Sequence, residues 1–343
     1  MLYNVGMYGG SFDPPHMGHM NVIMQAASMC KELHLIISYS PERDNIDYKQ
    51  RYQWLRCMTK DAVDNIIIHC VKDNAMNKCK YDWKSGATDI KNAVGKHIDI
   101  VFCGSDYLKT GIFEELYPSS IIKYIDRDEL GINISSTDIR NNPYKHWEYI
   151  PNIIKPYYTK KILIVGGEST GKSTLVRKLA TAFNTTYLQE VGRDICDRAG
   201  TEEFMLETDF YEILMKHKQL EYEKLAQANK VLFIDTDAIT TLFYSKLLCN
   251  NREIIKAYSE IAYGMSKINQ YDLIIFLEPN GVGFVQDGTR NENIEKNREY
   301  YSNVLKTEMD SMGFKYITIS GDYAERYNKA LNLVRNLMKT DIN

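Results

Sequence analysis

Residues 160–183 read KKILIVGGESTGKSTLVRKLATAF, and this stretch decides the fold of the second half of the chain. It begins with a short apolar run typical of a buried strand and ends with the spacing of an amphipathic helix. Between the two, residues 166–173 fit the pattern GxxxxGK[ST] at every fixed position. Such a loop cradles phosphates with its backbone amides. The stretch therefore predicts a nucleotide-binding loop between a strand and a helix.

The predicted loop supplies most of a candidate ATP site. We expect Lys172 to reach the β and γ phosphates and the Ser173 hydroxyl to hold Mg²⁺. A second expected metal ligand, the carboxylate of Asp235, ends the apolar run VLFID at 231–235. The complete set expected to contact ATP in this half is Gly166, Gly167, Glu168, Ser169, Thr170, Gly171, Lys172, Ser173 and Thr174.

Three further charged positions are candidates in this half. Glu190 and Arg193, in FNTTYLQEVGRDI at 183–195, follow a short strand-like segment. There Glu190 would accept the proton of an attacking hydroxyl and Arg193 would bind substrate, although a solvated charged turn has the same composition. Asp237 is a candidate substrate ligand, but a carboxylate at this position can instead cap the next helix.

A polar, glycine-containing stretch at 278–301 contains Asp287, Arg290 and Arg298. This composition is typical of a lid that closes over ATP, and it makes Arg290 a candidate catalytic residue that stabilises the transferring phosphate. An ordinary polar loop is the alternative interpretation.

The first half of the chain has a different loop, GGSFDPPHMGH at 9–19, again between a strand and a helix. Gly9 and Gly10 let backbone amides approach a phosphate closely, while His16 and His19 share one face of the helix. Two such histidines also suit a metal, but zinc needs further ligands, which the neighbouring sequence lacks. Histidines that donate to phosphate oxygens fit nucleotidyl transfer better.

This loop resembles the signature of the nucleotidyltransferase superfamily that includes nicotinamide-mononucleotide and pantetheine-phosphate adenylyltransferases. A second signature of that superfamily is similar to ISSTDIR at 134–140, where Ser135 or Ser136 would cap a helix. The resemblance implies attack of a mononucleotide phosphate on the α-phosphorus of ATP, with pyrophosphate leaving. It implies that His16 and His19 contact the reacting phosphates, that Arg140 and Ser136 grip pyrophosphate, and that Mg²⁺ bridges the oxygens.

The same resemblance extends to CGSDYL at 103–108, which is similar to the segment that cradles adenosine. The ATP contacts that it implies are Gly9, Gly10, Ser11, Phe12, Asp13, Gly104, Asp106, Ser135, Ser136 and Thr137. Trp83 is a candidate for stacking on a nicotinamide ring, because a flat cationic ring favours an indole face. A half-buried core tryptophan is the alternative.

Short apolar runs alternate with helical stretches along the whole chain, which predicts parallel sheets with crossover helices. The predicted strands are 34–39, 66–71, 98–104, 121–125, 160–166, 231–235, 272–278 and 314–319. The chain has 343 residues, which exceeds the usual size of a domain with a single hydrophobic core. Prolines interrupt the segment before Pro156, as is typical of a connector. We therefore expect two tandem α/β domains, a Rossmann-like nucleotidyltransferase at 1–155 and a P-loop kinase at 156–343.

Composition and charge exclude several classes of protein. The net charge of −3 gives no basic surface for nucleic acid, and the apolar runs are far too short to span a bilayer. No signal-peptide pattern begins the chain, and the 7 cysteines are scattered without a CxxC pair. We expect a cytoplasmic protein with reduced thiols whose partners are small molecules, with a homo-oligomer left open.

Taken together, the motifs resemble those of the bifunctional NadR-type proteins. The likeness rests on residues 155–174, FNTT followed by Glu190 and GR, FIDTDAITT at 233–241, the lid, RYN at 326–328 and the connector NNPYKHWEYIP. It implies a ribosylnicotinamide kinase joined to a nicotinamide-mononucleotide adenylyltransferase, with ATP, Mg²⁺, nicotinamide riboside, the mononucleotide and NAD as ligands.

Two departures from that family stand in the sequence. No helix-turn-helix segment precedes the first strand, so DNA binding is not expected. Gln189 stands where the family tends to have a tryptophan, which leaves open how the kinase stacks the nicotinamide ring. Three alternatives remain: an adenylyltransferase and kinase fusion of coenzyme A synthesis, a nucleotide sensor, and an enzyme with one active half.

Overall fold

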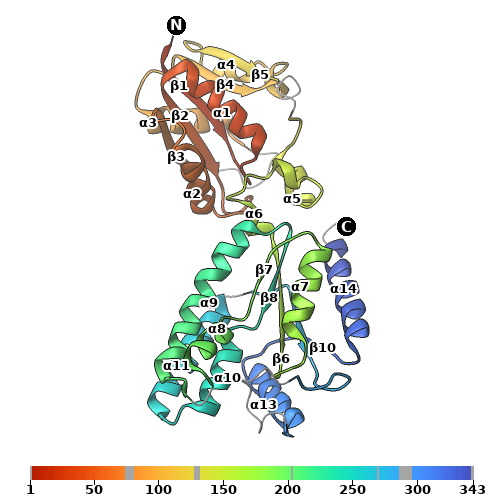
Figure 1. Cartoon of the computed structure of the whole chain (residues 1–343). Helices are drawn as coiled ribbons and strands as arrows, with labels where there is room; N and C mark the ends of the chain where they lie inside the picture. Colours follow the sequence, from red (N-terminus) through yellow and green to blue (C-terminus); the bar gives the residue numbers. More distant parts are fainter. Residues whose placement is uncertain are drawn as a thin grey trace. The chain divides into compact units, whose positions relative to one another are not determined.

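The computed structural model describes residues 2–73, 81–126, 132–201, 204–268, 270–285 and 296–340. The chain divides into two compact units, Met1–Lys155 and Pro156–Asn343. Each unit contains a five-stranded sheet in which every pair of neighbours is parallel (Figure 1). The predicted fold class, two parallel-sheet α/β domains in tandem, is confirmed.

The sheet of the first unit has the strand order β3-β2-β1-β4-β5. Its strands are β1 (Tyr3–Gly10), β2 (Cys30–Tyr39), β3 (Ile66–Lys72), β4 (Ile100–Gly104) and β5 (Ile121–Ile125). From β1 the chain builds outward through β2 and β3, then crosses to the other side of β1 to form β4. The strand order thus reverses between β1 and β4, and α/β sheets bind ligands beyond the carboxyl ends of the strands at such a point.

Helices cover both faces of this sheet. The helices of this unit are α1 (Met17–Met29), α2 (Tyr48–Thr59), α3 (Trp83–Val94), α4 (Ile112–Leu116) and α5 (Ser136–Asn141), with the short helices η1 (Ser105–Tyr107) and η2 (Trp147–Tyr149), while α6 (Lys155–Tyr158) contains the boundary between the two units. Side chains of α1 and α2 pack with Leu33, Leu35 and Ile37 on one face. Side chains of α3 and α4 pack with Ile36 on the other. The middle of β2, Leu33–Ile37, is therefore buried from both sides and is apolar apart from His34, as is typical of parallel strands.

The sheet of the second unit has the strand order β10-β9-β6-β8-β7. Its strands are β6 (Lys160–Gly166), β7 (Tyr187–Leu188), β8 (Val231–Asp235), β9 (Leu273–Leu277) and β10 (Ile317–Ile319). The order reverses at β6, which places the loop after this strand at the centre of the ligand-binding edge. The strand predicted at 314–319 is shorter than expected because its pairing with β9 begins only at Ile317.

The helices of the second unit are α7 (Lys172–Ala182), α8 (Val191–Ala199), α9 (Glu207–Gln227), α10 (Ala238–Leu248), α11 (Arg252–Ile268), α13 (Arg298–Ser311) and α14 (Tyr323–Thr340). Helices α7 and α14 pack on one face of the sheet, and α10 and α13 pack on the other. Helices α8, α9, α10 and α11 form a further apolar cluster beside the sheet, and Figure 1 shows them gathered on that side of the unit.

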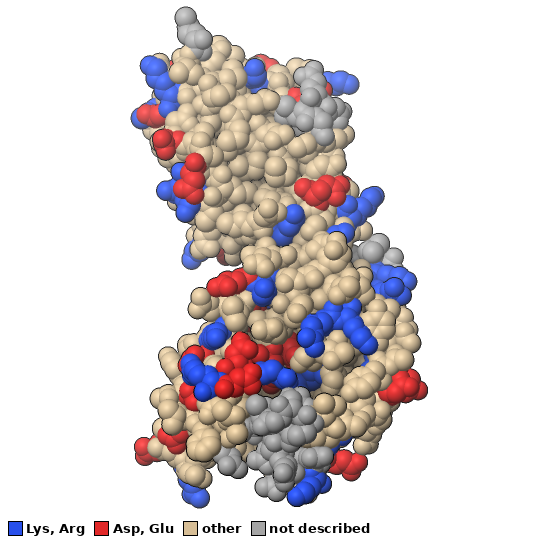
Figure 2. All heavy atoms as spheres, in the orientation of Figure 1, with Lys and Arg blue, Asp and Glu red and all other residues tan. Residues whose placement is uncertain are grey.

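The described surface is mixed in charge. Figure 2 shows Lys and Arg side chains interspersed with Asp and Glu side chains over the face that it draws. Within the described ranges, no helix combines the length and the apolar character needed to cross a membrane.

Candidate active sites

The loop after β1 is closed by a buried carboxylate. Asp13 is only 4% exposed and accepts hydrogen bonds from the backbone N–H of Asn45, the side-chain amide of Asn45 and the backbone N–H of Ile46, at 3.1, 3.3 and 3.1 Å. These bonds tie the loop to the segment that follows β2. Asp13 therefore orders the loop.

The two histidines of this loop lie against each other at the start of α1. His16 is the N-cap residue of α1, and its backbone N–H donates to Nδ1 of His19 at 3.3 Å. Their ring centroids are 3.7 Å apart, and His16 is 1% exposed. Because the first amides of a helix face an anion bound there, both imidazoles stand where a phosphate would meet the helix. No group of three or more His, Cys, Asp or Glu side chains arranged as a metal site occurs within the described ranges.

The second signature packs directly onto this loop. Ser135, not Ser136, caps α5, because its side chain accepts from the backbone N–H of Asp138. The Ser136 hydroxyl instead donates to the carbonyl of Pro14 at 2.8 Å. The Arg140 guanidinium donates to the carbonyl of Asp13 and, at 3.0 Å, to the Thr137 hydroxyl. The two predicted motifs thus form one surface.

The remaining predicted residues of this unit have looser surroundings. Gly104 ends β4 next to β1, and Asp106 is exposed in η1. Trp83 is half-buried at the start of α3. Its indole contacts the rings of Tyr81, Tyr107 and Phe113 edge to face, at 4.9, 5.7 and 6.0 Å between centroids. These contacts agree with the interpretation of Trp83 as a core side chain.

A buried arginine that sequence reasoning missed supports the same loop. Arg51 of α2 is 1% exposed and donates to the carbonyl of Ser11 and to the Asp44 carboxylate, both at 2.6 Å. The bond to Ser11 fixes the backbone just after the two glycines. A single arginine in an amphipathic helix carries no local signal of this role.

The loop after β6 has the shape expected of a phosphate cradle. Gly166 has φ +150°, and a Cβ there would lie 2.5 Å from the Leu277 carbonyl oxygen, so only glycine fits. The Thr170 hydroxyl and the Lys172 ammonium both donate to the carbonyl of Gly167, at 2.9 and 3.0 Å. Lys172 begins α7, which places its amide and those that follow at the helix N-terminus.

Asp235 ends β8 as a fully buried carboxylate. Neither of its oxygens has a hydrogen-bond partner among the residues that the structure describes. Burial and, next, the charge of Glu190 raise the pKa of Asp235 to about 6, although the charge of Lys172 lowers it. Asp235 is therefore near enough to Glu190 and Lys172 for their charges to affect its ionisation.

Asp237 has a structural role that the sequence left as an alternative. Its carboxylate accepts from the backbone N–H groups of Ile239 and Thr240 at 3.1 and 3.4 Å and so caps α10. Burial raises the pKa of Asp237 to about 6. Asp237 is not among the described residues that line the cavities beside the loop.

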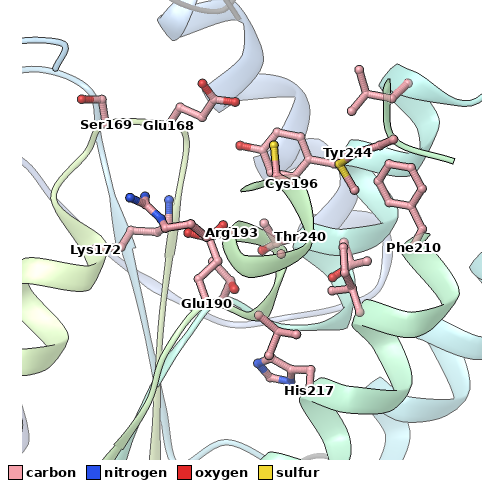
Figure 3. Close-up of a pocket in the computed structure, with 17 residues that line it drawn as sticks. Glu168, Ser169, Lys172, Glu190, Arg193, Cys196, Phe210, His217, Thr240 and Tyr244 are labelled. Carbon is pink, nitrogen blue, oxygen red and sulfur yellow. The ribbon is translucent and has the colours of Figure 1, made fainter. Parts of the chain in front are cut away.

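Two cavities border the loop after β6. The loop cavity is lined by Ser169, Thr170, Gly171, Lys172, Ser173, Thr174, Arg177, Glu190, Arg193, Val285 and Tyr323. The helix-walled cavity (Figure 3) is lined by Glu168, Ser169, Lys172, Glu190, Val191, Gly192, Arg193, Cys196, Met205, Phe210, Ile213, His217, Thr236, Thr240, Thr241, Tyr244 and Leu248. Both cavities share Ser169, Lys172, Glu190 and Arg193. The predicted residues thus stand at a junction between two chambers.

Two arginines that are distant in sequence donate hydrogen bonds to carbonyls of this loop. Arg326 of α14 is 2% exposed and donates to four carbonyls, those of Gly321, Thr170, Glu278 and Asn280, at 2.6–2.8 Å. Arg298, expected in the lid, donates to the carbonyls of Val282 and Ser169 at 3.0 and 3.3 Å. Arg290 and Asp287 lie outside the described residues.

Family models match both units. A cytidylyltransferase-like model matches residues 7–142, and an AAA domain model matches residues 161–326. Over nearly the whole chain, two curated bacterial relatives align, each called "Trifunctional NAD biosynthesis/regulator protein NadR". The Escherichia coli protein is 31% identical, across 97% of this chain and 83% of that protein, and the Salmonella typhimurium protein is 32% identical, across 98% and 83%. The chain belongs to the NadR family of NAD biosynthesis proteins.

Solved NadR structures share the fold. The crystal structure of a NadR protein in complex with NR superposes with a TM-score of 0.80 at 23% identity, covering 98% of this chain and 96% of that one. A NadR protein in complex with NAD and AMP-PNP gives 0.79 at the same identity and coverage. The expected NadR membership is therefore confirmed, as is the expected role in NAD biosynthesis for an enzyme with one nucleotidyltransferase-type and one kinase-type domain.

The phosphopantetheine adenylyltransferases are weaker relatives. The Lachnoclostridium phytofermentans enzyme is 26% identical over 145 residues, which is 35% of this chain and 88% of that enzyme. The match to the NadR proteins covers both units, whereas the match to this adenylyltransferase covers about a third of the chain. The alternative of an enzyme of coenzyme A synthesis is therefore less well supported.

Proposed function

We propose that the NadR-type chain makes NAD from nicotinamide riboside in two ATP-dependent steps, one in each domain. Residues 156–343 phosphorylate the riboside to the mononucleotide, and residues 1–155 transfer the adenylyl group of a second ATP to the mononucleotide, releasing pyrophosphate. The ligands named for the solved NadR structures, NR, NAD and AMP-PNP, are a substrate, the product and an ATP analogue of these steps.

The junction of the two cavities in the second unit carries the proposal. A kinase must bring the γ-phosphate of ATP and the acceptor hydroxyl to one point from two directions. The loop cavity offers backbone amides and Arg177 to the ATP phosphates, and the helix-walled cavity offers a separate chamber for the acceptor. Lys172, Glu190 and Arg193 border both, so they stand where the phosphoryl group would cross.

Each junction residue takes a role that its chemistry suits. Lys172 balances charge on the β and γ phosphates, and Glu190 accepts the proton of the ribose 5′-hydroxyl as that oxygen attacks phosphorus. Arg193 is exposed at the rim of both cavities, where it is positioned to neutralise the transferring phosphate. Arg290 remains a predicted lid residue with the same task.

The residues around Asp235 fit a magnesium ion. Both oxygens of this buried carboxylate are without hydrogen-bond partners among the described residues, and Ser173 is close enough to lower the pKa of Asp235. A buried carboxylate of this kind suits a hard cation that also binds phosphate oxygens. Ser173 and Asp235 would hold Mg²⁺, which supplies positive charge to the phosphates when bound.

The far end of the helix-walled cavity suits the nicotinamide ring. Phe210 and Tyr244 contribute aromatic rings, and Met205, Ile213 and Leu248 make the surrounding wall apolar. In Figure 3 both rings lie across the cavity from Lys172. Gln189 is exposed and does not belong to the described lining, so Phe210 and Tyr244 take the stacking task that the family's tryptophan suggested.

The first unit holds the adenylyltransferase site at the joined signatures. His16 and His19 face the phosphates that react, and Arg140, positioned by Asp13 and Thr137, neutralises the leaving pyrophosphate. Ser136 and Thr137 complete this surface, and Gly9, Gly10 and Gly104 line the strand ends where adenosine enters. Catalysis here is positioning and charge neutralisation, without a covalent enzyme intermediate.

We place the protein in the cytoplasm as part of this proposal. Cys30, Cys57, Cys70, Cys103 and Cys249 are free thiols, which agrees with a reducing compartment. Cys57 and Cys70 are exposed rather than core residues.

Product analysis tests the proposal. The full chain is incubated with Mg²⁺, ATP and nicotinamide riboside, beside the Lys172→Ala and His19→Ala variants. We expect the wild type to form NAD, Lys172→Ala to leave the riboside unchanged while still converting added mononucleotide, and His19→Ala to accumulate mononucleotide. A wild type that makes neither product, or that adenylylates phosphopantetheine instead, would overturn the proposal.

A further inference from the structure

His217 is a polar side chain in the wall of the helix-walled cavity. It projects from α9, and the residue is only 6% exposed. Its Nε2 atom is buried and has no hydrogen-bond partner among the described residues. A buried ring nitrogen without a partner costs free energy, so it is retained where a ligand completes the bond.

The protonation state and tautomer of the His217 ring determine whether Nε2 donates or accepts a hydrogen bond. Burial lowers the pKa of His217, against the charge of Glu221 and a hydrogen bond to the backbone of Thr236, so the imidazole is neutral at pH 7. A bond that raises a histidine pKa is one in which the ring donates. The proton is therefore on Nδ1, directed to the Thr236 carbonyl, and Nε2 presents a lone pair. His217 is a hydrogen-bond acceptor.

The place of His217 in the cavity identifies the part of the ligand that it meets. Phe210 and His217 lie on the same helix, seven residues or roughly 10 Å apart along its axis. Phe210 belongs to the aromatic end, whereas His217 is close enough to Glu190 for that charge to raise its pKa. Figure 3 shows Glu190 between Lys172 and His217. A nucleoside with its base at Phe210 and its 5′-hydroxyl at Glu190 has its sugar ring beside His217.

We propose that Nε2 of His217 accepts a hydrogen bond from a secondary hydroxyl of the ribose, at C2′ or C3′, of the nucleoside bound in the helix-walled cavity. The inference rests on the proposed kinase reaction, to which it adds the residue that recognises the sugar. A neutral acceptor matches a hydroxyl donor, and it leaves the carboxylate of Glu190 free for the 5′-hydroxyl.

This contact exists both before and during phosphoryl transfer, because the secondary hydroxyls do not react. Its loss therefore weakens ground state and transition state alike and raises KM with little change in kcat. A residue that served only to keep the cavity folded would not distinguish between ligands. Deleting the ligand hydroxyl and deleting the acceptor should therefore not be additive.

The test compares the full-length wild type with His217→Leu, which removes the acceptor at similar size, and His217→Gln, which keeps a carbonyl acceptor. Kinase kinetics are measured with nicotinamide riboside, its 2′-deoxy and 3′-deoxy analogues, and nicotinic acid riboside. Conversion of added mononucleotide to NAD by the first unit is the internal control for folded, active protein in every sample.

We expect His217→Leu to lose roughly ten- to hundredfold in kcat/KM for nicotinamide riboside, through KM, and His217→Gln to recover most of that loss. One deoxy analogue should be poor for the wild type yet lose nothing further with His217→Leu. Equal kinetics for wild type and His217→Leu, or an equal loss with every riboside, would overturn the inference. A loss of kcat/KM with nicotinamide riboside but not with nicotinic acid riboside would also overturn it, because the contact would then be to the carboxamide and not to the ribose. A wild type that phosphorylates no riboside would instead contradict the proposed kinase function.

Discussion

Arg140 donates a hydrogen bond to the main-chain carbonyl of Asp13, a residue 127 positions earlier in the chain. The same guanidinium lies 3.6 Å from the Asp13 carboxylate, so its charge is partly balanced by the loop that it would serve in catalysis. The contact joins the two signatures of the first unit into one structure. Arg140 is thus held against the loop that carries His16 and His19 before a nucleotide binds.

The Arg140→Lys variant tests whether the hydrogen bonds that position Arg140 matter in addition to its positive charge. Lysine keeps the positive charge but has no planar fork to span Asp13 and Thr137. Adenylyl transfer to the mononucleotide should fall by roughly tenfold or more, whereas riboside phosphorylation should stay unchanged. The exposed Arg56→Lys, on α2 of the same unit, is the control. Normal NAD formation by Arg140→Lys would contradict the assigned role.

Two adjacent glycines allow a sharp test of the second loop. A Cβ at Gly166 would lie 2.5 Å from the Leu277 carbonyl oxygen, whereas a Cβ at Gly167 meets no atom within 4 Å. We expect Gly166→Ala to lower the free energy of unfolding of the second unit by about 1–3 kcal/mol and Gly167→Ala to leave it nearly unchanged. Calorimetry of both variants measures this difference. Equal losses of unfolding free energy would show that the contact with the Leu277 carbonyl is not what requires glycine at position 166.

The sequence predicted those parts of the fold and site that have a local pattern. The strand before Gly166, the loop and the helix after it are contiguous, so spacing alone indicates them. His16 and His19 are likewise close in sequence, and the structure shows their rings in contact.

Residues whose partners are distant in sequence were not predictable in this way. Arg326 reaches Thr170 across 156 positions and Arg51 reaches Ser11 across 40. Each is a single charged residue in an amphipathic helix, where a solvated face is the ordinary expectation. His217 gave no signal for the same reason, because its importance arises only when α9 packs beside Thr236 and Glu190. Asp237 shows the converse: a motif carboxylate whose hydrogen bonds are those of a helix cap.

A pair of histidines outside the predicted site gives the first unit a pH dependence. Nδ1 of His34 and Nε2 of His69, on β2 and β3, are 2.8 Å apart. Burial lowers the pKa of both, and for His34 it outweighs the opposing effect of Glu32. Because protons bind more weakly in the folded state than in the unfolded chain, this contribution to stability is present above pH 6.5 and is lost as pH falls through the lowered pKa values.

We therefore expect the His34→Gln/His69→Gln variant to lose less thermal stability than the wild type between pH 7.5 and pH 5, by roughly 2–4 °C in Tm. His97 is an exposed histidine of the same unit, with a side chain 62% exposed, and His97→Gln should follow the wild type. Identical pH profiles for the wild type and the double variant would show that the pair does not contribute.

Arg326 should be the residue of the second unit whose loss is most costly outside the apolar core. Its guanidinium satisfies the carbonyls of Gly321, Thr170, Glu278 and Asn280 at once. Arg326→Met fills similar space but leaves these acceptors without their donor, and each buried unsatisfied group costs about 1–3 kcal/mol. We expect the free energy of unfolding of the second unit to fall by about 3 kcal/mol or more.

Kinase activity should fall with it, because the Thr170 carbonyl belongs to the loop that holds ATP. Arg335→Met, at an exposed position of the same helix, is the matched control and should cost less than about 0.5 kcal/mol. Denaturant unfolding and kinase assays of the same variants distinguish a loss of stability from a direct loss of nucleotide binding. If Arg326→Met keeps wild-type stability but loses kinase activity, the guanidinium acts on the nucleotide rather than on the loop, and the bracing role assigned here is wrong.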